Sequence, residues 1–277
     1  MISGKARLAG ILGWPVSHTK SPRLHNRWIA DYGLDGAYVP LPVAPEHLRD
    51  AVKTLPRLNF AGGNVTVPHK EAVLDLIDLV EPLAARIGAV NTLVIGSDGR
   101  ITGSNTDAIG FLLNLKEAPG FSSRTGPAVI LGAGGAARAA CAALLEDGVP
   151  EIRLVNRSLA RAKQLAADLG GPIVPIDWSG RAEALAGAAL LVNSTSLGMT
   201  GQPPLEISLD LLPETALVND LVYAPLETGL LAAARARGNP VADGIGMLLH
   251  QARPGFLAWF GVMPEITPAI REMMLKP

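Results

Sequence analysis

A glycine-rich segment in the middle of the chain has the residue types and spacing of a phosphate-binding turn. It consists of Gly132, Ala133, Gly134, Gly135, Ala136 and Ala137. Apolar runs over 128–131 and 152–155 flank it, with an alanine-rich stretch between, which predicts strand, turn, helix and strand. Gly132 permits a tight turn, Gly134 lets the backbone approach a pyrophosphate, and Ala137 allows close helix–strand packing. The start of the helix favours an anion. Small residues also serve plain packing, but this context favours a dinucleotide site.

The residues after the second of these strands indicate which dinucleotide is bound. An NAD site usually has Asp or Glu there, because the carboxylate holds the ribose 2′-OH. This chain has Asn156, Arg157 and Ser158 instead, with Arg161 one turn further on. Two guanidiniums and a hydroxyl suit a 2′-phosphate. Solvated surface arginines are the alternative. We predict that the cofactor is NADP.

Lys70 is predicted to lie at the start of a helix, a position where a cation does not stabilise the helix. Residues 64–67 are predicted to form a strand with Asn64 and Thr66 on one face. Pro68 then ends the strand and opens a predicted helix, which puts Lys70 in its first turn. The helix dipole opposes a cation there, so the position hints at a function. An exposed surface lysine is the ordinary alternative.

Two hydroxyls lie between the first predicted strand, 6–13, and a predicted helix to about residue 32. Ser21 precedes Pro22, which is typical of an N-cap followed by proline at the first helical position. Thr19 and Ser21 would then have only turn and capping roles. Hydroxyls at a strand end beside a helix start also suit a carboxylate. The residues alone do not choose between these readings.

The remaining pattern predicts two α/β domains. In the first, strands alternate with helices, and residues 92–104 form a hairpin around Ser97-Asp98-Gly99, so its sheet is mixed. Asp107 follows this hairpin and could cap the next helix. The second domain is a doubly wound, Rossmann-like sheet. Its later strands are predicted over 173–176, 190–193, 217–220 and 240–242.

Two strand ends of the second domain, 193–199 and 220–223, are polar, and ligands bind at such carboxyl ends. Both loops are therefore candidates for contact with the nicotinamide and its substrate. The apolar helix that begins at Gly244 is expected to return with the C-terminus to the first domain. We therefore predict a substrate-binding domain over 1–107 and 244–277 and an NADP-binding domain over 108–243.

Composition excludes several classes of protein. The chain has 277 residues and a net charge of −1, which gives no electrostatic case for nucleic acid or an anionic membrane. A single cysteine, Cys141, lies in a predicted helix and favours a reducing compartment. No apolar run is long enough to span a membrane, and no secretory signal is recognised. The histidines lack metal-ligand spacing, so we expect no metal. We expect a cytoplasmic protein, monomeric or homodimeric.

Taken together, the motifs resemble the shikimate/quinate dehydrogenase family. The matching segments, in the family's order, are HTKSP at 18–22, GNVTVPHK at 63–70, GAVNT at 88–92, NTD at 105–107, GAGGAA at 132–137, NRS at 156–158, NSTSLGM at 193–199, DLVYAP at 220–225 and GIGMLLHQ at 244–251. The resemblance implies two α/β domains and NADPH-dependent reduction of 3-dehydroshikimate to shikimate, in aromatic amino-acid biosynthesis.

The resemblance also implies roles for individual residues. Lys70 and Asp107 would be the catalytic pair, and which group gives the final proton stays open. Thr19 and Ser21 would bind the substrate carboxylate. The residues around the ring hydroxyls and carboxylate would be Asn64, Thr66, Asn91, Tyr223 and Gln251. The expected cofactor contacts are Gly132, Ala133, Gly134, Gly135, Ala136, Asn156, Arg157, Ser158, Arg161, Thr195 and Gly244.

Two positions depart from the family's pattern. Thr19 stands where serine is more common, and its methyl group leaves the preference for shikimate over quinate open. Ala108 stands where glycine is common after the Asp, with only a local packing effect expected. An enzyme of quinate or aminoshikimate metabolism is one alternative. A catalytically silent NADP-binding sensor is another, but the presence of Lys70 and Asp107 speaks against it.

Overall fold

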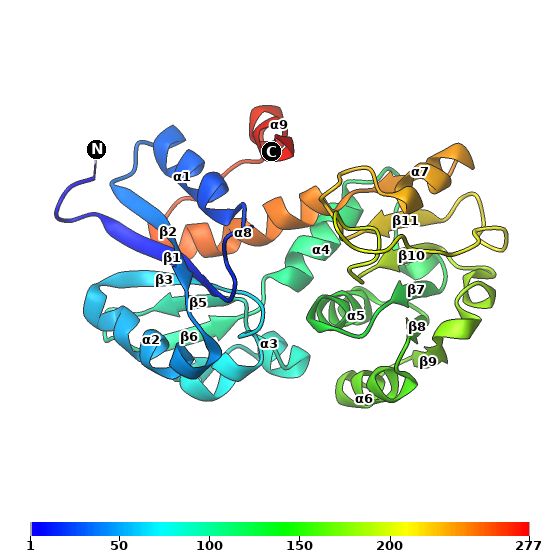
Figure 1. Ribbon diagram of the computed structural model, residues 1–277, viewed down its shortest axis with the longest axis horizontal. Coiled ribbons are helices and arrows are strands. Elements are labelled where there is room, and N and C mark those ends of the chain that lie inside the picture. The colour runs from blue at the N-terminus through cyan, green and yellow to red at the C-terminus, as the bar shows by residue number, and fades with distance from the viewer. Residues whose placement is uncertain (1, 277) are drawn as a thin grey trace. The chain divides into compact units, whose positions relative to one another are not determined.

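The computed structural model describes residues 2–276 and divides into two compact units (Figure 1). The first unit contains residues up to 106 and from 251 onward, and the second contains 107–250. The boundaries expected from the sequence are 107/108 and 243/244. Asp107 and the first turns of the long C-terminal helix therefore fall in the second unit.

The first unit is built on a mixed sheet in the order β2-β1-β3-β5-β6-β4. Its strands are β1 (Arg7–Gly13), β2 (Gly36–Pro42), β3 (Phe60–Val65), β4 (Leu79–Val80), β5 (Thr92–Ile95) and β6 (Ile101–Ser104). Strands β1, β2 and β3 run parallel, whereas β5 is antiparallel to both β3 and β6. The predicted hairpin and the mixed character of the sheet are thus confirmed.

Helices within the described residues 2–276 complete the first unit. They are α1 (Ser21–Asp31), α2 (Leu48–Thr54), α3 (Pro82–Ile87) and α9 (Pro268–Leu275). The later part of α8 (Gly244–Phe260) also belongs here, since Trp259 Nε1 donates to Leu93 O over 2.8 Å. The C-terminal helices therefore return to the first domain, as predicted.

The second unit holds an all-parallel sheet in the order β12-β11-β10-β7-β8-β9. The strands are β7 (Ala128–Leu131), β8 (Ile152–Asn156), β9 (Ile173–Asp177), β10 (Leu190–Asn193), β11 (Leu217–Asp220) and β12 (Val241–Ala242). The helices are α4 (Asp107–Lys116), α5 (Gly135–Asp147), α6 (Leu159–Leu169), α7 (Gly229–Ala236) and the start of α8. This arrangement confirms the predicted Rossmann-like domain.

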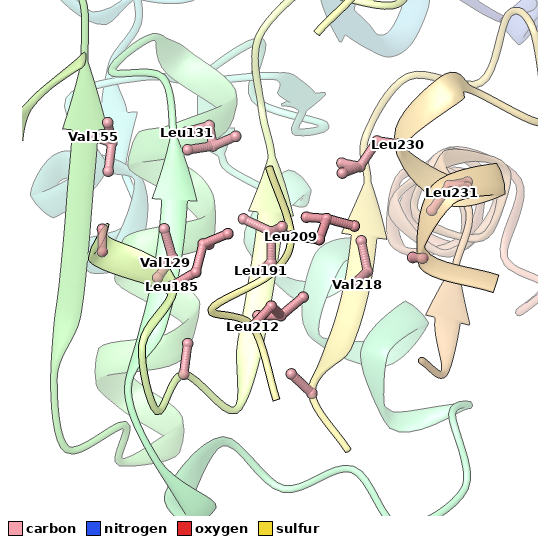
Figure 2. Packing of buried hydrophobic residues seen from close by; sticks show 14 residues of the cluster. Val129, Leu131, Val155, Leu185, Leu191, Leu209, Leu212, Val218, Leu230 and Leu231 are labelled. Atoms are coloured by element: carbon pink, nitrogen blue, oxygen red, sulfur yellow. The ribbon is translucent and has the colours of Figure 1, made fainter. Parts of the chain in front are cut away.

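Aliphatic side chains fill the second unit. Figure 2 shows Val129, Leu131 and Leu191 side by side on their strands, with Leu230 and Leu231 of α7 packed near Val218. Parallel strands are buried on both faces, which explains why each reads as a short apolar run in the sequence. The sheet is therefore a rigid base for the polar residues at its carboxyl edge.

Candidate active site

Asn64 lies at the end of β3 in a buried network of polar side chains. Its Nδ2 donates to Asn91 O over 3.1 Å and to Thr92 Oγ1 over 3.2 Å. Its Oδ1 accepts from Tyr38 Oη over 2.6 Å. Both ends of the amide are thus occupied, so the side chain has one fixed orientation. Thr66 follows β3, and its methyl group lies close to Gly13 at the end of β1.

Asn91 is the centre of the same network. Its Oδ1 accepts from Thr106 N over 2.8 Å and from Thr92 Oγ1 over 2.9 Å. Its Nδ2 donates to Thr106 Oγ1 over 3.0 Å and lies 3.4 Å from Gln251 Oε1. Three of the residues named from the family motifs, Asn64, Asn91 and Gln251, therefore belong to one connected cluster in the first unit.

The predicted N-cap at Ser21 is wrong. Helix α1 begins at Ser21 itself, Lys20 is the N-cap residue, and no side chain caps the helix. Thr19 Oγ1 accepts from Ser21 N over 3.2 Å instead. The Ser21 side chain is buried. A capping role therefore no longer accounts for the Ser21 hydroxyl.

The helix predicted after Pro68 is also wrong. Lys70 lies in a turn, and only a short 3₁₀ helix, Ala72–Leu76, follows. Two tertiary bonds hold this turn: His69 Nε2 lies 2.7 Å from Val43 O, and Lys70 O accepts from Val90 N over 2.8 Å. Lys70 is thus placed by its backbone bond to the segment before Asn91, and the argument from an opposing helix dipole does not apply to it.

The glycine turn of the second unit has the predicted geometry. Gly132 has a φ of +108°, which favours glycine, and a Cβ there would lie 2.8 Å from Ser194 Oγ. A Cβ at Gly134 or Gly135 would meet nothing within 4 Å, so the backbone at the start of α5 faces open space. Ala137 is fully buried. This turn offers free backbone N–H groups at a helix start, which fits a pyrophosphate.

The end of β8 carries exposed cations. Arg157 and Arg161 are exposed, and neither forms an ion pair with any carboxylate in residues 2–276. Asn156 Nδ2 donates to Ser158 O over 2.9 Å, and Ser158 Oγ caps α6 by accepting from Arg161 N. Asp177, which pairs with Asn156 in the sheet, directs its carboxylate to Ser179. The two guanidiniums are therefore available to a phosphate.

Thr195 is positioned by Asn193, which is buried and bonded to the buried Asp220 of the neighbouring strand. Asn193 Oδ1 accepts from Thr195 N over 3.1 Å and from Thr195 Oγ1 over 2.7 Å. Asn193 Nδ2 in turn donates to Asp220 Oδ1 over 2.9 Å. Burial raises the pKa of Asp220, and hydrogen bonds from Thr228, Val222 N and Asn193 oppose part of that rise. The polar ends of β10 and β11 are thus joined.

Three further predicted residues lie in the second unit. Asp107 is buried and begins α4, directly after Thr106 of the Asn91 network. Tyr223 follows β11, and partial burial raises its pKa. A Cβ at Gly244 would lie 2.5 Å from Leu221 O, so the close approach of two backbones already requires glycine there.

Cysteine chemistry, metal binding and membrane insertion are the other possibilities to examine. Cys141 is buried in α5, and burial raises its pKa to about 12, so it is a small packing residue, as predicted. Over residues 2–276, no group of three His, Cys, Asp or Glu side chains could hold a metal ion. Across the same residues, no helix is long and apolar enough to cross a membrane.

Sequence reasoning missed Tyr38, and it named Asn193 and Asp220 only as the first residues of two polar strand ends, without the bond between them. Tyrosine is common in strands, so Tyr38 gave no signal beyond strand formation. Asn193 and Asp220 end two apolar strands, and a buried polar residue at that point was a usable signal, since it needs a partner. The structure supplies that partner by pairing them with each other.

Comparison with known proteins decides the family. The chain is 62% identical over 276 residues to the shikimate dehydrogenase (NADP(+)) of Paramagnetospirillum magneticum, covering 99% of this chain and 100% of that protein. The chain belongs to the shikimate dehydrogenase family. Residues 11–93 match the family model described as shikimate dehydrogenase substrate binding domain, and residues 116–199 match shikimate / quinate 5-dehydrogenase.

Solved structures of the shikimate dehydrogenase family share the fold. Shikimate 5-dehydrogenase from Thermus thermophilus, in complex with NADP(H) and shikimate, is 40% identical with a TM-score of 0.86, covering 97% of this chain and 98% of that one. Quinate dehydrogenase from Corynebacterium glutamicum, in complex with NAD, is 32% identical with a TM-score of 0.91, covering 98% and 99%. The predicted resemblance is confirmed over the whole chain.

Proposed function

We propose that this chain catalyses the reversible, NADPH-dependent reduction of 3-dehydroshikimate to shikimate, a step in aromatic amino-acid biosynthesis. The observation that carries the proposal is 62% identity over 99% of the chain to a shikimate dehydrogenase (NADP(+)). The first unit, with its buried polar network, is proposed to bind the substrate. The second unit, with its glycine turn, is proposed to bind NADP.

The proposed substrate contacts come from residues that the network orients. Thr19 and Ser21 bind the carboxylate, to which hydroxyls donate well. The ring hydroxyls and carboxylate are contacted by Asn64, Thr66, Asn91, Tyr223 and Gln251. Asn64 and Asn91 are each hydrogen-bonded at both ends, and such locked amides give binding without a further ordering cost.

Lys70 and Asp107 are the proposed catalytic residues. A hydride that reaches a ketone carbon builds negative charge on the carbonyl oxygen, and NADPH, when bound, supplies that hydride. The ammonium of Lys70 stabilises the charge on that oxygen, which ends the reaction as a hydroxyl after taking up one proton. The carboxylate of Asp107 orients the lysine and favours its charged form.

The second unit fits NADP better than NAD. The open backbone at Gly134 and Gly135 suits the pyrophosphate, and the exposed Arg157 and Arg161 suit a 2′-phosphate. The place where an NAD site carries an acid holds Asn156. Thr195 and Gly244 are proposed to contact the rest of the cofactor.

Two broader properties belong to the same proposal. The only cysteine is buried and unpaired, which favours a reducing compartment such as the cytoplasm. We expect a monomer or a homodimer.

Quinate oxidation is the second candidate activity. It is favoured by the methyl group of Thr19 and by structural similarity to the quinate dehydrogenase of Corynebacterium glutamicum. The test is NADP⁺ and NAD⁺ reduction with shikimate and with quinate in parallel. The proposal expects the highest kcat/KM with shikimate and NADP⁺. Higher kcat/KM with quinate would favour the second candidate, and no turnover of either substrate would indicate a binding protein.

A further inference from the structure

The loop that carries Thr19 and Ser21 has only a few hydrogen bonds of its own. Thr19 N donates to Val16 O over 3.3 Å, and Ser21 N donates to Thr19 Oγ1 over 3.2 Å. Lys20 O accepts from Leu24 N over 3.2 Å, which joins the loop to the start of α1. All three bonds are local in the sequence, so they shape the loop without fixing its place on the first unit.

The Lys20 side chain connects this loop with a distant part of the chain. Its Nζ donates to Met274 O over 2.9 Å and to Lys276 O over 3.1 Å. These carbonyls belong to the last turn and the C-cap of α9, which contacts α1 within the first unit. Among residues 2–276, no other hydrogen bond joins residues 15–20 to a segment more than five residues away.

The end of α9 is a favourable partner for a cation. The last carbonyls of a helix have no partner within the helix, and the helix dipole places partial negative charge there. Arg23 Nη1 also donates to Lys276 O, over 2.9 Å, so two cations from the start of α1 bind this helix end. The Lys20 side chain is half-buried, which limits screening of its bonds by water. The lysine between the two hydroxyls is therefore firmly anchored.

We propose that Lys20 is a positioning residue, whose bonds to the end of α9 hold the Thr19 and Ser21 hydroxyls in place for the substrate carboxylate. The inference rests on the proposed function, since it needs these hydroxyls to contact the substrate. The Lys20 ammonium is engaged with two carbonyls of α9, so it acts through the loop and not on the carboxylate itself. Without this anchor, the loop must be ordered when the substrate binds, and that cost falls on substrate affinity.

The test is Lys20→Met, which keeps an unbranched side chain and removes the donor. We expect the KM for shikimate to rise roughly three- to ten-fold, as for one charge-assisted hydrogen bond that water partly screens. The KM for NADP⁺ should not change, and kcat should fall less than the KM rises. Lys20→Arg keeps a cationic donor and should restore most of the affinity. A role in stability alone would lower the amount of folded enzyme and leave the KM unchanged.

Arg23→Met is the matched control. It removes one positive charge from the start of α1 and one bond to Lys276 O, but it leaves the bond from Lys20 to Met274 O in place. It should leave both KM values unchanged. A double-variant cycle tests the route of the effect: in a Ser21→Ala background, Lys20→Met should raise the shikimate KM by a smaller factor, because one of the hydroxyls that the lysine positions is missing.

Met274→Ala is a second variant, which acts from the other side of the contact if Lys20→Met does not fold. Met274 is fully buried in the last turn of α9, so its truncation loosens the acceptor carbonyls without changing any charge. It should raise the KM for shikimate in the same direction and leave the KM for NADP⁺ unchanged.

Three results overturn the inference. The first is an unchanged shikimate KM in Lys20→Met, or in Met274→Ala if that is the variant that folds. The second is an equal rise in Arg23→Met, which would assign the effect to the charge of α1. The third is a difference between Lys20→Met and the wild type that vanishes at high salt, as expected for long-range attraction of the carboxylate. A wild-type protein that does not turn over shikimate would instead remove the proposed function.

Discussion

Arg157 offers the most direct test of how this chain selects NADP. The perturbation is Arg157→Ala, at the exposed end of β8. Because Arg157 forms no ion pair with a carboxylate within residues 2–276, its removal breaks no such bond in the folded protein. We therefore expect the unfolding midpoint to stay unchanged, and the whole effect to appear in cofactor binding.

The magnitude follows from the charged hydrogen bond that the 2′-phosphate would lose. A hydrogen bond between charged groups contributes about 1.5–3 kcal/mol, which corresponds to roughly a ten- to hundred-fold change in affinity. Arg157 is exposed, so water and salt screen the interaction and favour the lower end of this range. Arg161 is proposed to share the phosphate, which also keeps the loss from a single substitution near ten-fold.

The assay measures KM for NADP⁺ and for NAD⁺ at saturating shikimate, together with the binding of 2′,5′-ADP and 5′-AMP. Arg157→Ala should raise the KM for NADP⁺ and weaken 2′,5′-ADP, while NAD⁺ and 5′-AMP change little. Lys163→Ala removes an exposed cation from α6, the helix that follows Arg157, and serves as the control. Equal losses with both cofactors would refute a contact between Arg157 and the 2′-phosphate.

Three other predictions concern the first unit and the proposed catalytic residues. Lys70→Ala should lower kcat by roughly 10²–10⁴-fold with a smaller change in KM, and Asp107→Asn should also be slow. If kcat of the double variant falls by the product of the two single losses, Lys70 and Asp107 act independently. Ser21→Ala should raise the KM for shikimate and leave NADP⁺ binding unchanged; the reverse pattern would place this loop in the wrong site. His25 is fully buried and its pKa is lowered to about 3, mainly by burial, so below pH 6.5 only the unfolded chain gains its proton. As the pH is lowered from 6.5 to 3, this group should therefore reduce the free energy of unfolding by about 1.4 kcal/mol per pH unit. Denaturant unfolding at pH 7 and at pH 5.5 should show a smaller loss of free energy between the two pH values for His25→Phe than for the wild type.

Elements with strong local signals could be predicted from the sequence. Strands β10 and β11 have the predicted bounds, because short apolar runs in a parallel sheet are buried on both faces. Gly132 has the positive φ that its turn requires. In these places the local pattern and the tertiary structure demand the same conformation.

The errors arose where tertiary bonds outweighed a local pattern. The apolar residues after Pro68 recur at helical spacing, yet Leu79 and Val80 pair with β6 as a short strand, and Asp78 N donates to Ile101 O. At the other end of this segment, the turn at His69 is bound to Val43 O. Sheet pairing and one buried histidine therefore leave room for a single 3₁₀ turn only. No property of residues 68–80 alone reveals these partners.

The part of the site that could not be predicted depends on amide side chains that connect distant segments. Asn91 accepts from the backbone of Thr106, the residue before Asp107, while the adjacent Val90 donates to the backbone of Lys70. One short segment, 90–91, thus holds the backbone at Lys70 and the chain leading to Asp107. An amide suits this place because it offers a donor and acceptors in a fixed geometry without adding a charge to a buried network. A carboxylate at position 91 would accept from Thr106 equally well, but it could not donate to Thr106 Oγ1, and burial of its charge would be costly. The network therefore requires a neutral donor and acceptor at its centre, and the sequence meets that requirement with asparagine.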